Sequence, residues 1–270
     1  MARYTFEHLD SLIAPLRRSP FGLITDVDGT ISPTAPTPQQ AEVSPLCRRY
    51  LDLLSHQIAL VAAVSGRSAA QVAQMVAVRG MVYIGNHGLE RWVDGHPKLT
   101  EEARGYQEML EASLEDLQPL LSIEGIIIEN KGITATVHYR RSPDPASAEK
   151  QIMEALKNSP QASKLQTMPG RMAINLLPPA AINKGTAISD LIREYGLGGG
   201  IYLGDDVTDI DAFKAIRGHS QDTGFQGLAI GVISDEMPET LTGEVDFILN
   251  GVRDVERFLE WLSRTASQPG

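Results

Sequence analysis

The chain has 270 residues, of which 42% are hydrophobic and 21% are charged, and its formal net charge is −10. This composition predicts a globular protein with a sizeable core and disfavours a broad nucleic-acid surface, which needs clustered Lys and Arg. Cys47 is the only cysteine, which excludes an intrachain disulfide and a multi-cysteine metal site. The N-terminus has no secretory apolar core and no apolar run approaches a transmembrane length. We therefore expect a cytoplasmic protein without a membrane partner.

Alternating strand and helix patterns occupy both ends of the sequence. Phe6, Leu9, Ile13 and Leu16 repeat at helical spacing and predict an amphipathic helix. Short apolar runs predict buried strands that start at positions 21, 58, 81, 201, 228 and 246, and helical patterns from 68, 185 and 252 separate many of them. This alternation predicts an α/β fold with a doubly wound, mostly parallel, Rossmann-like sheet.

The middle of the chain has a different pattern, which predicts an inserted α+β domain over residues 105–179. Its order is helix, strand, strand, repeated once, with the segments 100–121, 124–130, 132–140, 145–159 and 164–177. Lys131-Gly132 and Pro169-Gly170 mark the two expected hairpin turns. Residues 1–104 and 180–270 are then predicted to form the core domain.

Paired carboxylates follow the first buried strand, in "TDVDGT". Asp26 should end the strand and Asp28 should lie in the loop, where Gly29 permits a sharp turn. An ionised Asp can act as a nucleophile, and a second carboxyl can act as acid and base. The alternative is an ordinary turn rich in Asp and Gly.

Three further stretches follow at predicted strand ends or helix starts. Ser65 in "VSGRS" and Lys184 in "NKG" could hold an anion at a helix start. The crowded carboxylates of "GDDVTDID" suggest a hard divalent cation with oxygen ligands. Taken singly, these features are also explained by helix caps and a solvated lysine. Together, at one edge of one sheet, they match the needs of phosphoryl transfer.

In this order, "DVDGT", "SGR", "NKG" and "GDDVTD" resemble the four motifs of the haloacid dehalogenase superfamily of aspartate-nucleophile phosphatases. The αββαββ insertion resembles the type-C2B cap of that superfamily. The stretches "GNHGLE", "ENKG", "HYR" and "GRMAIN" narrow the resemblance to the trehalose-6-phosphate phosphatases, over nearly the whole chain. The resemblance implies Mg²⁺-dependent hydrolysis of a sugar phosphate, most simply trehalose 6-phosphate, and functional coupling to a trehalose-6-phosphate synthase.

The resemblance also implies a role for individual residues. Asp26 would be phosphorylated, and Asp28 would protonate the leaving oxygen and then activate water. The implied phosphate ligands are Ser65, Gly66 and Lys184, and the implied metal ligands are Asp26, Asp28 through its carbonyl, Asp205 and Asp209. The implied sugar ligands are Arg67, Glu129, Lys131, Arg171 and Asn175, where Asn175 replaces the family's Glu. His87 and His138 either touch the substrate or pack.

Other classes of protein also use clustered carboxylates or glycine-rich loops. An EF-hand fails because Gly and Glu are not at the required positions of the loop, and "GLGGG" precedes a strand instead of following one, as a dinucleotide site needs. A signalling receiver domain, a sugar phosphomutase and a phosphatase of another sugar or glycosyl-glycerate phosphate remain as alternatives. A receiver would not be expected to carry the insertion.

Overall fold

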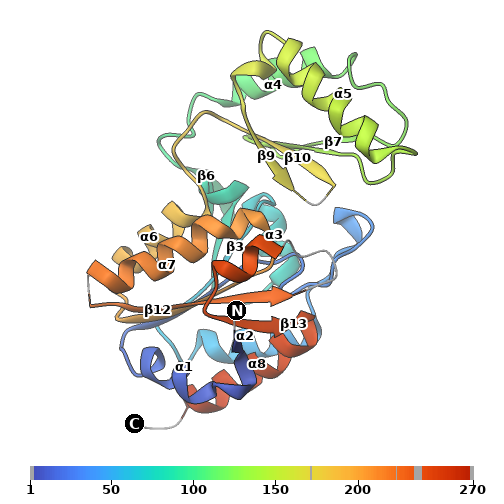
Figure 1. Cartoon of the computed structure of the whole chain (residues 1–270). Coiled ribbons are helices and arrows are strands. Elements are labelled where there is room, and N and C mark those ends of the chain that lie inside the picture. The colour runs from blue at the N-terminus through green and yellow to red at the C-terminus, as the bar shows by residue number, and fades with distance from the viewer. Residues whose placement is uncertain (1–2, 171, 223, 234–238, 268–270) are drawn as a thin grey trace. The chain divides into compact units, whose positions relative to one another are not determined.

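The chain forms two units, one built on a large sheet and one on a smaller sheet (Figure 1). The computed structural model describes residues 3–170, 172–222, 224–233 and 239–267. Residue contacts group residues 1–97 with 182–270, here called the parallel-sheet unit, and residues 98–181, here called the inserted unit. The limits predicted for the insertion, residues 105 and 179, lie within the inserted unit.

The large sheet has nine strands, in the spatial order β1-β13-β12-β11-β2-β3-β4-β5-β6. Its strands are β1 (Arg3–Tyr4), β2 (Phe21–Thr25), β3 (Leu60–Val64), β4 (Val82–Gly85), β5 (Glu90–Val93), β6 (His96–Leu99), β11 (Gly199–Gly204), β12 (Gln226–Ile233) and β13 (Phe247–Asn250). Along this spatial order, all neighbouring strands between β1 and β4 pair in parallel, whereas β5 pairs antiparallel with β4. The α/β prediction with a mostly parallel sheet is therefore confirmed.

The central parallel strands β2, β3 and β11 are buried along their whole length because helices cover both faces of the sheet. In β2, Leu23 packs into one hydrophobic cluster and Ile24 packs into the other. The helices of this unit are α1 (Leu9–Leu16), α2 (Pro45–Ser55), α3 (Ala69–Val76), α6 (Lys184–Glu194), α7 (Ile210–Asp222) and α8 (Gly251–Ala266). Helices α1, α2 and α8 lie on one face, and α6 and α7 lie on the other (Figure 1).

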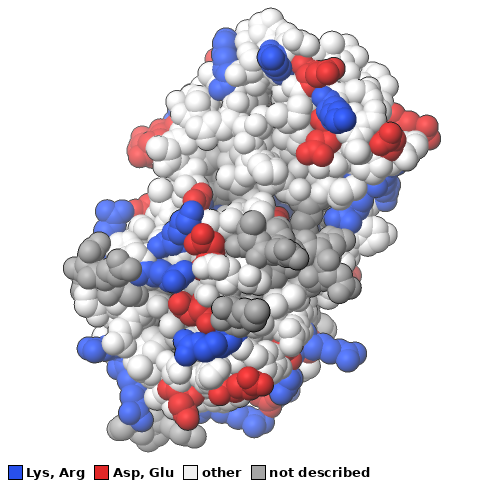
Figure 2. Space-filling view, viewed as in Figure 1, with Lys and Arg blue, Asp and Glu red and all other residues white. Residues whose placement is uncertain are grey.

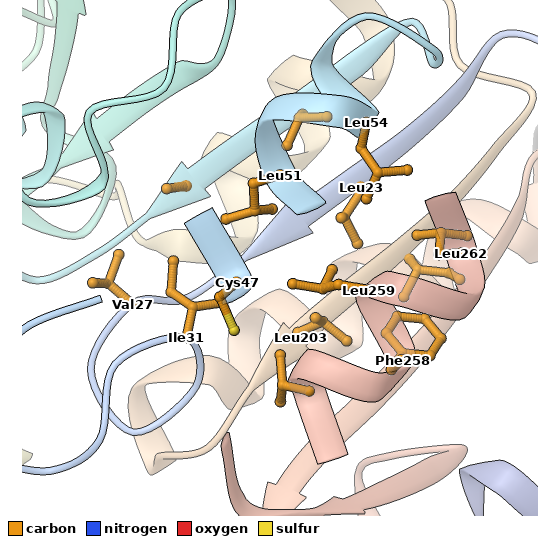
Figure 3. Packing of buried hydrophobic residues seen from close by; sticks show 14 of the residues in the cluster. Leu23, Val27, Ile31, Cys47, Leu51, Leu54, Leu203, Phe258, Leu259 and Leu262 are labelled. Carbon is orange, nitrogen blue, oxygen red and sulfur yellow. The ribbon is translucent and has the colours of Figure 1, made fainter. Parts of the chain in front are cut away.

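The first of these clusters fixes the loop that follows β2. Val27 and Ile31 lie in this loop, and both are fully buried against Cys47 of α2 (Figure 3). Leu259 of α8 packs into the same cluster. Val27 and Ile31 thus fix the loop that begins at Asp26 by packing into this cluster, and the polar side chains of the loop lie at the edge of the sheet.

The N-terminal prediction was wrong in its limits. The helix α1 starts at Leu9, and Phe6 lies before it in a 3₁₀ turn that follows the short edge strand β1. Pairing of β1 with β13 explains the difference, because backbone hydrogen bonds to a neighbouring strand override helical periodicity. The sequence patterns also did not predict α2, α7, β5 or β6.

The inserted unit consists of two helices against one face of a four-stranded antiparallel sheet. Its order is β7-β8-β10-β9, with β7 (Ile127–Asn130), β8 (Ala135–His138), β9 (Gln166–Gly170), β10 (Ala173–Leu177), α4 (Gln107–Leu117) and α5 (Pro145–Asn158). Val137 and Ile174 are buried in one cluster with Leu110 of α4 and Ile152 of α5. The predicted αββαββ order is therefore present.

Two predicted positions within this unit were wrong. The first helix begins at Gln107 instead of Thr100, after Gly105, whose φ of +92° breaks the helix. Pro169 and Gly170 belong to β9 and do not form the turn, since Pro169 pairs with Ile174. Proline has no backbone N–H to donate. It is tolerated here because β9 is an edge strand, which has a neighbouring strand on one side only.

Charged side chains of both signs are interspersed on the face of the molecule seen in Figure 2. The described part of that face therefore carries no continuous basic surface of the kind that phosphate backbones bind. Among the described helices, none combines the length and the apolarity that crossing a bilayer requires.

Candidate active site

The site begins where β2 ends, because Asp26 extends the sheet pairing by one residue. Its amide donates to the carbonyl of Leu203 over 2.8 Å. Gly29 then reverses the chain with φ +83°, and a Cβ at this position would lie 1.9 Å from Oδ2 of Asp205. Glycine is therefore required twice here, for the left-handed backbone and for the close approach of Asp205.

A buried cluster of three carboxylates and one ammonium lies at this edge of the sheet. Lys184, the first residue of α6, places Nζ 2.8 Å from Oδ1 of Asp26 and 2.6 Å from Oδ1 of Asp209. Asp205 follows β11 and is fully buried. The alternative of a solvated surface lysine is excluded, since Lys184 is only 2% exposed.

Asp209 is held from four directions. Its Oδ1 accepts from Lys184 and from the hydroxyl of Tyr202, which lies 2.6 Å away. Its Oδ2 accepts from the backbone amides of Asp205 and Asp206. The Asp209 carboxylate thus ties the loop after β11 to Lys184 of α6 and to Tyr202 of β11.

Burial and mutual attraction set the protonation of the cluster. Burial raises the pKa of Asp26 to about 7, against the lowering effect of Lys184. Burial alone would lower the pKa of Lys184, but the attraction of Asp209 and Asp26 holds that pKa above its ordinary range. The lysine is therefore a permanent cation, whereas the ionised form of Asp26 needs further positive charge.

The donor set fits a hard divalent cation. One carboxylate oxygen from each of Asp26, Asp205 and Asp209 can be chosen so that all three lie within 4.8 Å of one another. Oxygen ligands of this kind suit Mg²⁺ or Ca²⁺, and Gly29 keeps the space beside Asp205 clear of a side chain.

The next strand along the sheet brings "SGR" to the same edge. The amide of Ser65 donates to the carbonyl of Ile84, and its Oγ accepts from the amide of Arg67. Arg67 grips Asp28 with two hydrogen bonds, from Nε to Oδ2 over 2.6 Å and from Nη2 to Oδ1 over 2.7 Å. Such a bidentate pair fixes the plane of the Asp28 carboxylate.

Gly66 and His87 lie against each other beside this pair. A Cβ on Gly66 would lie 2.6 Å from Cε1 of His87, which is 4% exposed and has φ +59°. The absence of a side chain at position 66 therefore allows the imidazole to be buried there.

A second polar cluster lies within the inserted unit, on the sheet face opposite its apolar cluster. Oε2 of Glu129 lies 2.9 Å from Nε2 of His138 and 3.9 Å from Nζ of Lys131. On the neighbouring strand, the hydroxyl of Thr136 donates to Oδ1 of Asn175 over 2.8 Å. The predicted ligand Arg171 lies outside the described residues.

The sequence prediction thus anticipated most members of both clusters but missed Tyr202 and Thr136. Both belong to strands whose apolar neighbours suggest plain core positions. The only sequence feature that could have indicated their polar contacts is a hydroxyl-bearing side chain within an otherwise apolar strand. Arg67, which the resemblance implied as a sugar ligand, pairs with Asp28 in the structure.

The parallel sheet, its acid-rich carboxyl edge and the inserted αββαββ unit together define a haloacid-dehalogenase-like hydrolase fold. A haloacid dehalogenase-like hydrolase from Bacteroides thetaiotaomicron aligns with a TM-score of 0.63 at 15% identity, over 89% of this chain and 98% of that one. The C-terminal domain of trehalose-6-phosphate phosphatase from C. albicans aligns with a TM-score of 0.78 at 20% identity, over 98% of both chains. At these identities the likeness shows the fold.

The chain belongs to the trehalose-phosphatase family, whose family profile matches residues 24–242. A trehalose-phosphate phosphatase of Mycobacterium bovis is 31% identical over 217 residues. That match covers 78% of this chain and 54% of the relative, so the chain spans about half the length of that relative.

Proposed function

We propose that the protein is a Mg²⁺-dependent phosphatase that hydrolyses a sugar phosphate, with trehalose 6-phosphate as the preferred substrate. The observation that carries the proposal is the buried contact of Lys184 with Asp26, inside a carboxylate cluster at the strand ends. Membership of the trehalose-phosphatase family supports it. Functional coupling to a synthase that supplies the sugar phosphate, in the cytoplasm, is part of the same proposal.

In the first step, a carboxylate oxygen of Asp26 attacks phosphorus while the bond from phosphorus to the sugar oxygen breaks. Asp28 enters this step protonated, not as the carboxylate that pairs with Arg67 in the structure, and gives its proton to that leaving oxygen. Lys184 and the hydroxyl and amides of the "SGR" turn hold the phosphoryl oxygens. A bound Mg²⁺ would supply positive charge that offsets repulsion between Asp26 and the substrate.

In the second step, water attacks the phosphorus of the aspartyl phosphate. Asp28 takes the proton of this water, and the bond from phosphorus to Asp26 breaks to release inorganic phosphate. Asp26 and Asp205 would hold the cation, together with the backbone carbonyl of Asp28. Asp209, which the resemblance also implied as a metal ligand, would support this set instead of binding the cation, because its oxygens already accept four hydrogen bonds.

The sugar would be recognised by the polar cluster of the inserted unit. Glu129 and Lys131 form an ion pair there, and Asn175 lies one strand beyond Thr136. Asn175 is the observation that favours a second candidate, a phosphatase of another sugar or glycosyl-glycerate phosphate. An amide can donate hydrogen bonds, whereas the carboxylate usual at this position only accepts them.

The deciding experiment measures phosphate release from a panel of sugar phosphates, with Mg²⁺ and with excess chelator. Trehalose 6-phosphate should give the highest kcat/KM, and the chelator should abolish turnover. A preference of more than about 100-fold, or about 2.7 kcal/mol, for another sugar phosphate would replace the substrate and keep the reaction. Accumulation of a stable phospho-protein without turnover would favour a receiver-like protein, and an isomerised product would favour a phosphomutase.

A further inference from the structure

Strand β8 is the inner strand between β7 and β10, and it faces two environments. Ala135 and Val137 are fully buried in the apolar cluster under α4 and α5. The intervening Thr136 and the following His138 point to the opposite face, because side chains alternate along a strand. These two polar side chains are the ones that contact Glu129 and Asn175 on the flanking strands.

On one side, His138 holds Glu129. Glu129 pairs in register with Thr136, so His138 is its diagonal neighbour, which a long or aromatic side chain can reach. The distance from Nε2 to Oε2 is 2.9 Å, and the Glu129 side chain is only 13% exposed. A carboxylate buried to this extent needs a donor, and the imidazole supplies one in addition to Lys131.

On the other side, Thr136 holds Asn175. The two residues are directly opposite in the antiparallel pair, and both are buried, at 3% and 9% exposure. The hydroxyl donates to Oδ1, and the amide nitrogen Nδ2 lies over Gly170, where a Cβ would be 3.0 Å away. The hydrogen bond from Thr136 orients the amide group, so Asn175 presents its amide nitrogen as a donor.

We propose that Thr136 and His138 are positioning residues for sugar recognition, acting through Asn175 and Glu129. The inference rests on the proposed function, which assigns Glu129 and Asn175 to the sugar. Both recognising side chains are fixed before a substrate arrives, so less rotamer entropy is lost on binding. The pair offers a carboxylate and an amide donor, a combination that suits a ligand rich in hydroxyl groups.

The test uses Thr136→Val, which deletes the donor at nearly constant shape, and His138→Phe. For each, kcat/KM is measured with trehalose 6-phosphate and with p-nitrophenyl phosphate, which carries no sugar. The ratio of the two should fall about tenfold per variant, as expected for one hydrogen bond worth about 1.4 kcal/mol. The change should appear mainly in KM for the sugar phosphate.

Conservative variants and a matched control separate positioning from general damage. Thr136→Ser and His138→Gln keep a donor and should restore the ratio to within about threefold. Thr167→Val, on exposed β9, should leave it unchanged. In a Glu129→Gln background, His138→Phe should have little further effect, because its partner is already altered.

An unchanged ratio for Thr136→Val and His138→Phe overturns the inference, as does an equal loss with both substrates. Full additivity of His138→Phe with Glu129→Gln overturns the part that concerns Glu129. If the unaltered protein prefers another sugar phosphate, the proposed substrate fails, and the same ratio is then measured with the preferred compound. A structural defect in His138→Phe would show as a lowered Tm, and His138→Gln then decides.

Discussion

The two polar clusters of this protein are stabilised in different ways. In the parallel-sheet unit, charges from distant segments of the chain converge: Asp26, Lys184 and Asp209 are each at most 6% exposed at their side chains. Backbone amides hold Asp209 there. In the inserted unit, the partners lie on neighbouring strands, as in Glu129 with His138, or two residues apart, as in Glu129 with Lys131.

The position of the first cluster is fixed by the backbone of the parallel-sheet unit, whereas the contacts of the second cluster can be changed by replacing single side chains. Moving Asp26 would require moving β2, whereas replacing Thr136 or Asn175 changes one contact on an otherwise intact sheet. We therefore expect substitutions in the first cluster to remove the chemistry and substitutions in the second to change which sugar is accepted.

The largest effect is expected for Asp26→Asn, which keeps the shape of the side chain and removes the nucleophile. Turnover should fall by at least about 1,000-fold, or about 4.1 kcal/mol, in a phosphate-release assay. Asp190→Asn, on an exposed ion pair, is the control and should retain activity. Activity of Asp26→Asn within about tenfold of the unaltered protein would exclude Asp26 as the nucleophile.

The second effect concerns the cation. Asp205→Ala should raise the Mg²⁺ concentration that gives half-maximal activity and lower kcat/KM by about 100-fold, because a carboxylate ligand is lost. Without metal, the same variant should have a higher Tm than the unaltered protein, since repulsion among buried carboxylates is relieved. Mg²⁺ titrations and thermal unfolding in EDTA measure both, with Asp211→Asn as the control. An unchanged Mg²⁺ requirement would contradict the assignment.

A smaller effect is expected in the second cluster. Asn175→Glu replaces an amide donor with a carboxylate, while Thr136 can still donate to it. If Asn175 limits the use of trehalose 6-phosphate, kcat/KM for that compound should rise about tenfold relative to the other sugar phosphates. The rank order of the panel is the readout. A fall for trehalose 6-phosphate would show that the amide is already adapted to it.

The smallest effect is a pH dependence of stability at Glu90, a carboxylate of the parallel-sheet unit. Burial raises its pKa above the ordinary value of 4.5, although the amides of Ala69 and Asn86 donate to it. Its contribution to stability is therefore full below that value and is lost as the pH rises through the raised pKa.

Glu90→Gln can keep the accepted hydrogen bonds and removes this titration. Relative to the unaltered protein, its free energy of unfolding should increase between pH 4.5 and neutral pH, as measured by urea unfolding. Glu115→Gln, on the exposed face of α4, should show no such trend. A parallel pH dependence for Glu90→Gln and the unaltered protein would argue that Glu90 does not titrate with a raised pKa.

Sequence patterns alone predicted the alternation of strands and helices, although not α2, α7, β5 or β6, and located polar residues at the strand ends. Apolar runs such as residues 21–25 predict buried strands, since a strand covered on both faces must be apolar throughout. Asp26 and Asp205 were identified because a carboxylate that directly follows such a strand must lie at the edge of the sheet. These inferences depend on neighbours in sequence, which periodicity and spacing report.

Which of these groups touch depends on the folded chain. The contact of Tyr202 with Asp209, the grip of Arg67 on Asp28 and the pairing of Thr136 with Asn175 join residues whose partners are set by strand register and helix packing. The β9 turn was misplaced for the same reason, because Pro169 is tolerated only through the edge position of its strand. A sequence pattern specifies which face a side chain occupies, but the partner across the sheet depends on a register that only the folded chain fixes.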